Sequence, residues 1–256
     1  MFGSAARVWA VVAVFQLAAC ASPPPASEGP VAEAGLAITP WTIASSAATD
    51  ATAWQHYKLP GKQPSHFSYV RKDGRDAMVA HSASSASMVR QVVRIEPEEL
   101  GSVRFSWKVP DLIAQADMAL RETDDSPVRI VLAFEGDRSK FSTKNAMLSE
   151  LARALTGEEM PYATLMYVWC NTRSRGSVIV NPRTDRIRKL VVESGSDKLR
   201  QWVDYERNIR ADYEKAFGEA PGALVGIGIM TDSDNTRSTT QAWYGPVTVG
   251  TFGRLK

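Results

Sequence analysis

The sequence predicts a mainly β protein, an antiparallel β-sandwich that carries two helical insertions. Apolar and polar residues alternate in several short runs, as they do in strands with one face buried and the other in water. Other runs are apolar on both faces, and only two stretches place apolar residues at helical spacing. Many short strands at close intervals, with two helices among them, are typical of a sandwich with insertions.

The N-terminus comes before this fold and predicts an exported lipoprotein. An apolar run over residues 8–19 ends in LAAC at Cys20 and is too short to span a bilayer. A cysteine directly after small residues is where lipoprotein processing attaches acyl chains. We therefore expect a signal peptide over residues 1–19 and a lipidated Cys20 that holds the protein on a membrane. Because Ala21 rather than Asp follows, the sequence resembles lipoproteins sorted to the Gram-negative outer membrane, and we expect it to face the periplasm.

Composition divides the rest of the chain into two parts. Residues 20–36 are rich in Pro, Ala, Ser and Gly, which predicts a flexible tether. No second break follows, so we predict one β-sandwich domain over residues 37–256. The 30 Lys and Arg residues nearly balance the 28 Asp and Glu residues, and no basic stripe with interleaved aromatic residues occurs. These features exclude nucleic acid as an expected partner.

Four runs give the clearest strands. In VRFSWKV (103–109) and VRIVLAF (128–134), alternation predicts strands of an antiparallel sheet with one face toward water. In YATLMYVWC (162–170) and ALVGIGIM (223–230), apolar residues on both faces predict central strands that are covered on both sides. Further strands are predicted in WQHYKL, HFSYV, MVRQVVRI, RIRKLVV and AWYGPVTVGTF.

Two stretches have helical periodicity instead. The first, over residues 142–155, begins at a capping Ser142 or Thr143 and stops at Gly157. The second covers residues 202–218 and ends at its glycine. We expect both helices to lie over the sandwich with their apolar faces, which consist of Met147, Leu148, Leu151, Ala154 and Leu155 in the first and Trp202, Ile209, Tyr213, Ala216 and Phe217 in the second.

Several motifs in order carry a family resemblance. They are FSWKVPD, ETDDSPVRIVLAFEG, YATLMYVWCN, VVESG, WVDYERNIRADYEKAFGEAP, GIGIMTDSDNT and AWYGPV. Over roughly residues 105–247 the chain resembles the bacterial domain of unknown function 3047 family. That family has no assigned activity. The resemblance implies a jelly-roll sandwich, similar to galactose-binding-like and other carbohydrate-binding modules, and fold alone does not establish function.

Acid and amide side chains lie at the ends of two predicted strands, and these are Asp124, Asp125, Asp232, Asp234 and Asn235. If the two strand ends share one rim, the carboxylates need a hard cation or Arg129 beside them. Oxygen ligands favour calcium over zinc, which makes Asp232, Asp234 and Asn235 candidate calcium ligands, although no cofactor is required. The alternatives are turns with Asp to Arg hydrogen bonds, or a ligand site that includes Asp124, Asp125 and Arg129.

Aromatic and helix residues complete the ligand-binding candidates. Tyr167, Trp169 and Trp243 lie in or beside strands, where exposed rings could stack on sugar faces, and core packing is the alternative. Arg207 and Asn208 lie in the second predicted helix. They either turn inward to hold the acid-rich loops or belong to a solvated helix face with salt bridges.

Three functions remain open. The first is a non-catalytic module that binds a glycan or another envelope ligand, such as an envelope protein. The second is a glycan-cleaving hydrolase that uses a pair of aspartates. The third is a structural or assembly lipoprotein. A nucleophile elbow, an HExxH motif and a glycine-rich phosphate loop are absent from the sequence, so the prediction leans away from an enzyme and towards the first function.

Overall fold

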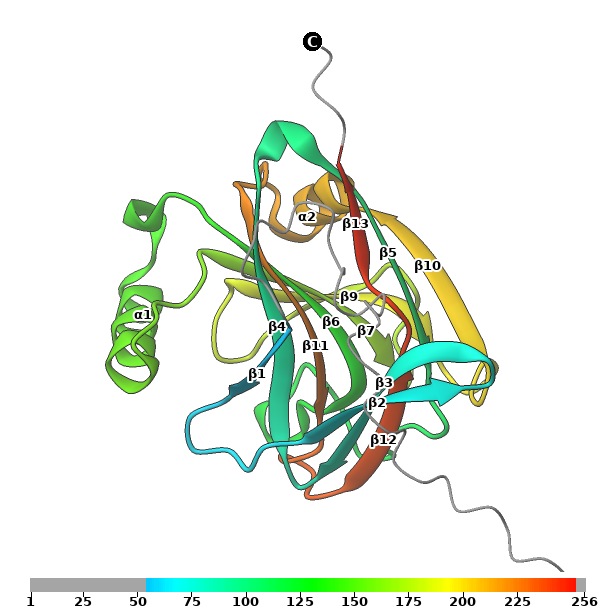
Figure 1. Cartoon of the computed structure of the whole chain (residues 1–256). Helices are drawn as coiled ribbons and strands as arrows, with labels where there is room; N and C mark the ends of the chain where they lie inside the picture. The colour runs from blue at the N-terminus through cyan, green and yellow to red at the C-terminus, as the bar shows by residue number, and fades with distance from the viewer. Residues whose placement is uncertain (1–53, 252–256) are drawn as a thin grey trace, which may run out of the picture. The chain divides into compact units, whose positions relative to one another are not determined.

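The alternating runs form β-strands, and in the computed structural model, which describes residues 54–251, these strands build two sheets (Figure 1). The described residues are mainly strand, with two α-helices inserted, which confirms the predicted fold class. No helix within residues 54–251 is long and apolar enough to cross a membrane. The predicted signal peptide, lipidated Cys20 and tether lie outside the described residues.

The first sheet has seven strands. In spatial order they are β1 (Gln55–Lys58), β4 (Ala86–Ile95), β11 (Leu224–Asp232), β6 (Ser126–Phe134), β7 (Ala163–Cys170), β9 (Ile187–Ser194) and β8 (Val178–Val180). The second sheet has six strands, which are β10 (Trp202–Asn208), β5 (Leu100–Lys108), β12 (Thr239–Tyr244), β3 (Arg75–Ala83) and β2 (His66–Lys72), with β13 (Thr248–Thr251) also paired to β5.

Short helices and two longer ones connect these strands. The 3-10 turns are Pro97–Glu99, Arg121–Thr123 and Arg138–Lys140, and the α-helices are α1 (Thr143–Thr156) and α2 (Ile209–Phe217). Neighbouring strands are antiparallel except β7 and β9, which run parallel. This pair is the exception to the predicted antiparallel sandwich, because the chain forms β8 between the two strands and so returns in the same direction.

Large aromatic rings fill the space between the sheets. Phe105 and Trp107 on β5 face Tyr167 and Trp169 on β7, with ring centroids 5.5 Å apart for Phe105–Tyr167 and 6.4 Å apart for Trp107–Trp169. All four are at most 3% exposed. The alternating pattern of residues 103–109 therefore predicted correctly that Phe105 and Trp107 are buried on one face of β5.

The seven-stranded sheet is also covered on its outer face. Met166, Val168 and Cys170 on β7 form a second apolar cluster there, and Met118 from the loop before β6 packs into it. A strand that is buried on both faces reads as a continuous apolar run. This confirms the prediction that residues 162–170 form a central strand.

The second predicted helix is shorter than expected. Residues 202–208 form β10, and α2 begins only after Asn208, whose Oδ1 accepts a hydrogen bond from the Ala211 amide at 2.9 Å. Trp202 therefore lies on a strand and not on the helix face. Ile209 and Tyr213 do form the buried face of α2, as predicted.

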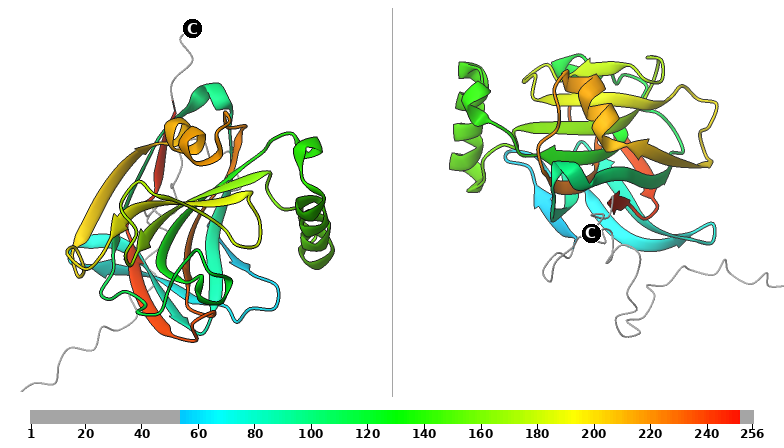
Figure 2. Two further views of the ribbon diagram at one scale, coloured as in Figure 1. Left: turned by 180° about the vertical axis from the view of Figure 1, so that it is seen from behind. Right: turned by 90° about the horizontal axis from the view of Figure 1, so that it is seen from above.

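The first predicted helix has the expected bounds but the opposite orientation. Ser142 caps α1 and Gly157 ends it in a left-handed conformation with φ of 78°. Its apolar face does not lie on the sandwich, because Met147, Leu151 and Leu155 are 54–69% exposed. Both views of Figure 2 show α1 to one side of the two sheets.

Candidate functional site

The structure brings the two acid-rich strand ends together. Asp124 and Asp125 directly precede β6, Asp232 is the last residue of β11, and Asp234 follows in the loop to β12. Oxygen atoms of Asp125, Asp232 and Asp234 all lie within 4.8 Å of one another. We call these four carboxylates the acid rim.

Arg129 on β6 provides the main countercharge. Its Nε and Nη2 donate to the two carboxylate oxygens of Asp232 at 2.9 and 2.8 Å, and Nη2 also donates to Asp124 Oδ1 at 3.1 Å. Arg129 is only 2% exposed and Asp232 only 4%. A buried bidentate pair of this kind satisfies both carboxylate oxygens of Asp232 with charge-assisted hydrogen bonds.

Lys189 on β9 is a second buried cation, and it lies next to the acid rim. Its side chain is fully buried, and its Nζ donates to Asp124 Oδ1 at 2.6 Å and to the Met118 carbonyl at 2.9 Å. The lysine therefore fastens the loop that covers the second apolar cluster to the sheet beneath it.

Burial and charge act against each other on these groups. Burial raises the pKa of Asp232 to about 7, and Asp124 and Asp125 add to the rise, whereas Arg129 opposes it. Burial lowers the pKa of Lys189 to about 8, with repulsion from Arg129 adding to the effect and Asp124 opposing it. Burial would raise the pKa of Asp124, but Arg129 and Lys189 outweigh it and the pKa is lowered.

The remaining acids hold the loops. Asp125 accepts hydrogen bonds from the Thr236 amide and hydroxyl, both at 2.6 Å, and from the Asn235 amide at 3.2 Å. Lys62 forms an ion pair with Asp234. The acids predicted as calcium ligands thus have internal partners, which occupy oxygens that calcium would need, and calcium binding stays a prediction.

The two predicted helix polar residues do not reach the acid rim. Arg207, at the end of β10, pairs with Asp212, with Nε 2.8 Å from Oδ2. Asn208 caps α2. Of the two alternatives, the one in which they turn inward to the acid-rich loops does not hold, because the strand β10 carries them to another part of the fold, where Arg207 forms a salt bridge with Asp212.

The three predicted aromatic ligand-binding candidates differ in burial. Tyr167 and Trp169 are at most 1% exposed and belong to the core, so they do not reach a ligand at the surface. Trp243 lies half-buried on the outer face of the six-stranded sheet, with Lys72 Nζ 4.9 Å from its ring centroid. Of the three rings, only Trp243 is exposed enough to contact a ligand at the surface.

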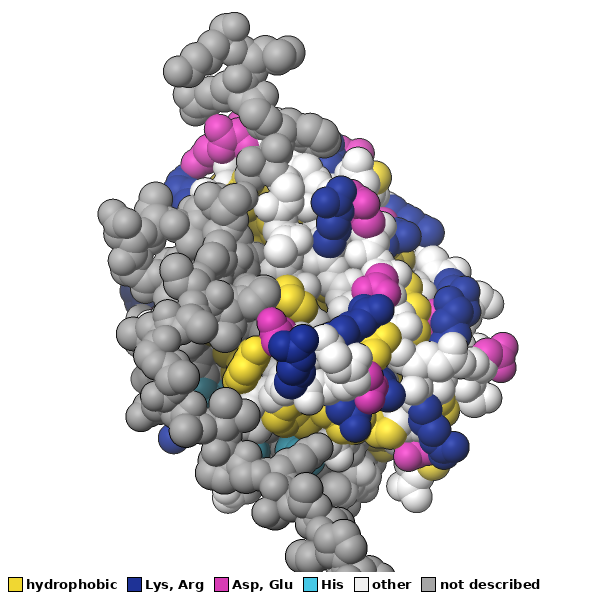
Figure 3. Space-filling view, turned by 45° about the vertical axis from the view of Figure 1, so that its right-hand side comes forward, with side chains coloured by type: hydrophobic (Ala, Val, Ile, Leu, Met, Phe, Trp, Pro, Cys, Tyr) yellow, Lys and Arg dark blue, Asp and Glu magenta, His cyan; other side chains and the backbone are white. Residues whose placement is uncertain are grey.

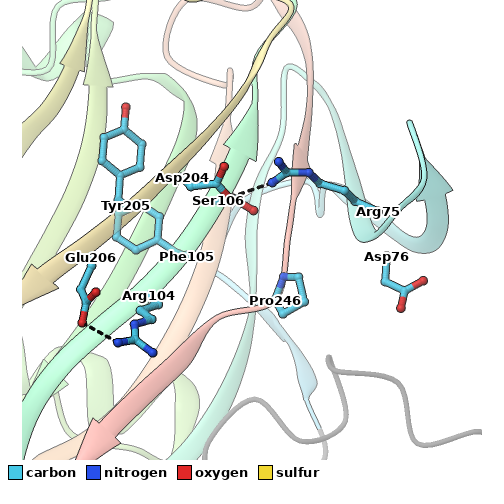
Figure 4. Close-up of a pocket in the computed structure, with 9 residues that line it drawn as sticks. All are labelled: Arg75, Asp76, Arg104, Phe105, Ser106, Asp204, Tyr205, Glu206 and Pro246. Atoms are coloured by element: carbon cyan, nitrogen blue, oxygen red, sulfur yellow. Dashed lines mark hydrogen bonds and ion pairs between the residues drawn. The ribbon is translucent and has the colours of Figure 1, made fainter.

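An open groove lies on this same outer face. It encloses about 610 Å³ and is lined by Arg75, Asp76, Arg104, Phe105, Ser106, Asp204, Tyr205, Glu206 and Pro246, which we call the outer groove (Figure 4). Its residues come from β3, β5 and β10 and from the turn before β13. Figure 3, where the right-hand side of Figure 1 comes forward, shows basic and acidic side chains next to one another.

Two ion pairs between strands shape the outer groove. Arg75 Nη1 lies 2.7 Å from Asp204 Oδ1 and joins β3 to β10, and Arg104 Nη2 lies 3.0 Å from Glu206 Oε1 and joins β5 to β10. Both pairs reach water, since their side chains are 44–69% exposed. Exposed pairs contribute little to stability, because water screens their charges and both side chains lose conformational freedom. Their hydrogen-bonding groups are therefore available to a ligand at small cost.

A tryptophan adjoins the outer groove. The Arg75 guanidinium lies 5.3 Å from the ring centroid of the half-buried Trp202. Gly245 leaves room beside this ring, because a Cβ there would lie 2.0 Å from the Ser106 hydroxyl oxygen and 3.7 Å from the indole. The groove thus combines a hydroxyl and paired charges, and the Trp202 ring lies beyond Arg75, next to these lining residues.

Sequence reasoning missed the outer groove for identifiable reasons. The alternation in residues 103–109 correctly marks Arg104 and Ser106 as outward-facing. Residues 202–208 were predicted as helix and residues 75–83 received no prediction. The groove therefore could not be assembled without knowing that β3 and β10 lie near β5.

The sequence was compared with protein-family models and with curated proteins. The sequence model described as "Protein of unknown function (DUF3047)" matches residues 52–248. No curated protein matches the chain.

Three similar solved structures are distant from this chain. The xyloglucanase domain of a type three effector from Sinorhizobium fredii, in complex with cellobiose, is 8% identical with a TM-score of 0.37, over 80% of this chain and 100% of that one. A low-affinity xylan-binding module from Roseburia intestinalis is 12% identical with a TM-score of 0.28, over 77% and 95%. A family 29 carbohydrate-binding module from Piromyces equi is 9% identical with a TM-score of 0.26, over 80% and 93%. Likenesses of this size do not identify a shared ligand or site.

Proposed function

Since the chain belongs to the DUF3047 family of proteins of unknown function, we propose its activity from its own geometry: a non-catalytic module that binds a glycan in the outer groove. The observation that carries this proposal is the groove of about 610 Å³ with two exposed ion pairs beside Trp202. Small-molecule sites usually enclose about 300–1,000 Å³.

The chemistry of the outer groove suits a neutral polar ligand. Arginine supplies only hydrogen-bond donors and a carboxylate only acceptors, so each ion pair can satisfy both functions of a sugar hydroxyl. Two arginines stand against three carboxylates among the lining residues, which leaves no basic excess for a phosphate or nucleic acid. An indole face beside these groups can pack on the apolar face of a sugar ring.

We also propose that the protein is a lipoprotein of the outer membrane that faces the periplasm. The support is the LAAC sequence that ends at Cys20 and the Ala that follows it. Acyl chains on Cys20 would hold the domain next to envelope glycans. Mass-spectrometric detection of an acylated N-terminal Cys20 tests this address. An N-terminus that begins elsewhere, without acylation, would contradict it.

The proposed glycan binding is tested by isothermal titration calorimetry of the full chain in detergent. The ligands are neutral and acidic polysaccharides and soluble peptidoglycan fragments. Loss of a hydrogen bond to a charged group costs about 1.5–3 kcal/mol, so Arg104→Met and Asp204→Asn should each weaken binding about tenfold or more. Arg200→Met is the matched control, because Arg200 forms an equally exposed pair with Asp111 outside the outer groove.

The outcomes separate the alternatives. Binding that is equal in the groove variants and the control would place the site elsewhere and refute the proposal. Release of reducing sugar during the titration would favour the hydrolase. The absence of heat with every polysaccharide and peptidoglycan fragment would favour the structural or assembly lipoprotein.

A further inference from the structure

Helix α1 exposes an apolar stripe that consists of Met147, Leu151 and Leu155, which are 69%, 54% and 62% exposed. These residues are four apart and therefore lie on one side of the helix. Three large apolar side chains together on one helix face form a patch of the kind that marks an interaction site. We call them the α1 stripe.

The helix is attached to the domain by its polar side. Asn145 donates to Asp185 at 2.7 Å and accepts from the Thr184 hydroxyl at 2.7 Å, and Ser149 accepts from Arg138 at 3.0 Å. Asn145 and Ser149 are at most 6% exposed. The polar side thus fixes the direction in which the α1 stripe faces, away from the domain.

The α1 stripe lies near the place where the N-terminal segment joins the fold. The Arg90 guanidinium stacks 3.9 Å from the ring centroid of Tyr57 on β1 and pairs at 2.5 Å with Glu158, just beyond the end of α1. Figure 1 shows β1 at the edge of its sheet, on the same side as α1. Strand β1, which directly follows the first described residue, Trp54, is therefore linked to the end of α1 through Arg90.

We propose that the α1 stripe docks on the lipid bilayer to which Cys20 is anchored. This inference rests on the acylation of Cys20 proposed above. The 33 residues between Cys20 and Trp54 span at most about 120 Å, so the anchor would keep Trp54 within that distance of the bilayer. Amphipathic helices lie in the membrane interface with the apolar side inward, and exposed Lys144 and Arg153 can extend their charged ends to the headgroups. An acyl anchor and an interfacial helix are two signals that together orient a domain on a membrane.

The test measures the depth of α1 in a bilayer. The full chain, purified from bacterial membranes, is reconstituted in vesicles of phosphatidylethanolamine with one quarter phosphatidylglycerol, part of it carrying a doxyl group on an acyl chain. A fluorophore is attached through Ala154→Cys on α1 or, for comparison, through Asp111→Cys, which is exposed outside α1. The buried Cys170 is 3% exposed and does not compete for the label. We expect several-fold stronger quenching at position 154.

Variants show whether the α1 stripe causes this difference. Met147→Gln, Leu151→Gln and Leu155→Gln, combined in the labelled chain, should make quenching at the two positions equal. Leu120→Gln with Val180→Gln is the control, since these apolar residues are 55% and 45% exposed outside α1. The control should retain the difference. Unchanged circular dichroism and unchanged glycan binding show that the triple variant is folded.

Each contrary result identifies its cause. A chain that floats with the vesicles but is quenched equally at both positions keeps its anchor and overturns the docking. A chain that does not float refutes the acylation, and the docking fails with it. Self-association that the triple variant abolishes, without quenching at position 154, would assign the α1 stripe to a second copy instead.

Discussion

At the level of single residues, Arg129 is the centre of the acid rim. A guanidinium that is 2% exposed, in contact with Asp232 and Asp124, is tolerated because two carboxylates surround it. Burial of two charges is costly, and their attraction offsets this cost only when the geometry satisfies their hydrogen bonds. The sequence suggested this arrangement, since Asp124 and Asp125 stand just before the strand that carries Arg129.

Removal of this cation should destabilise the protein strongly. Arg129→Met leaves the Asp232 carboxylate buried without its cationic partner, while Asp124 keeps Lys189, and this should lower the free energy of unfolding by about 3–5 kcal/mol in urea titrations. Arg94→Met, which removes two exposed pairs, with Glu96 and Glu135, should change it far less, because water screens such pairs. The combination of Arg129→Met with Asp232→Asn should regain part of the loss. Equal effects of the two arginine substitutions would contradict this account.

Lys189 should produce a pH dependence above neutrality. Its pKa is about 8 in the folded state and 10.5 as the ordinary value, so between these pH values the unfolded chain binds more protons. Stability from this group is therefore fully present above 10.5 and is lost as the pH falls through 8. The difference in unfolding free energy between wild type and Lys189→Met should change by up to about 3 kcal/mol across this window. Parallel curves would refute it.

At the level of elements, β10 and α2 show that hydrophobic periodicity alone does not decide where a strand ends and a helix begins. Residues 202–217 contain both an alternating segment and a helical one, and the apolar residues of the second also lie at positions compatible with one long helix. Pairing with β5 decides the first segment, from Trp202 opposite Lys108 to Asn208 opposite Ser102. Such long-range pairing overrides the local helix preference. It cannot be predicted from the sequence of residues 202–208 alone.

The start of α2 depends on one side chain. Asn208→Ala removes the acceptor for the Ala211 amide, which should cost about 1 kcal/mol of unfolding free energy, measured in urea. Asn208→Asp keeps a side-chain oxygen at the cap and should retain stability. If both variants lose the same amount, the cap does not determine where the helix begins.

Helix α1 shows the limit of reading burial from amphipathicity. Its bounds, cap and stop were predictable from Ser142 and Gly157. The orientation was not, because the same 3.6-residue period arises whether the apolar side faces a core or another partner. Contacts of Asn145 with the loop at residues 184–185 decide it, and that loop is distant in sequence.

At the level of the whole molecule, a tyrosine joins the two sheets. Tyr244 on β12 donates to the Met230 carbonyl on β11 at 2.6 Å and accepts from the Arg129 amide on β6 at 3.2 Å. Its hydroxyl also lies 2.8 Å from that of Thr231. Together with the aromatic core, these bonds couple the six-stranded sheet to the seven-stranded one.

The two sheets should therefore unfold as one unit. Circular dichroism and tryptophan fluorescence should give coincident urea transitions. Tyr244→Phe should lower stability by about 1–3 kcal/mol because buried groups lose a partner, without separating the transitions. Tyr69→Phe, which removes an exposed hydrogen bond to Asp76, should change it by at most about 0.5 kcal/mol. Two separate transitions in wild type would contradict the coupling.

The pairing order has a consequence for how the protein is made. The early strands β3, β4 and β5 take β12, β11 and β13 as neighbours, so neither sheet is complete until residues near the C-terminus are available. Synthesis delivers the chain from its N-terminus, and contacts between distant segments form late. The nascent polypeptide thus stays without a closed core for most of translation, which agrees with the export that we propose for it.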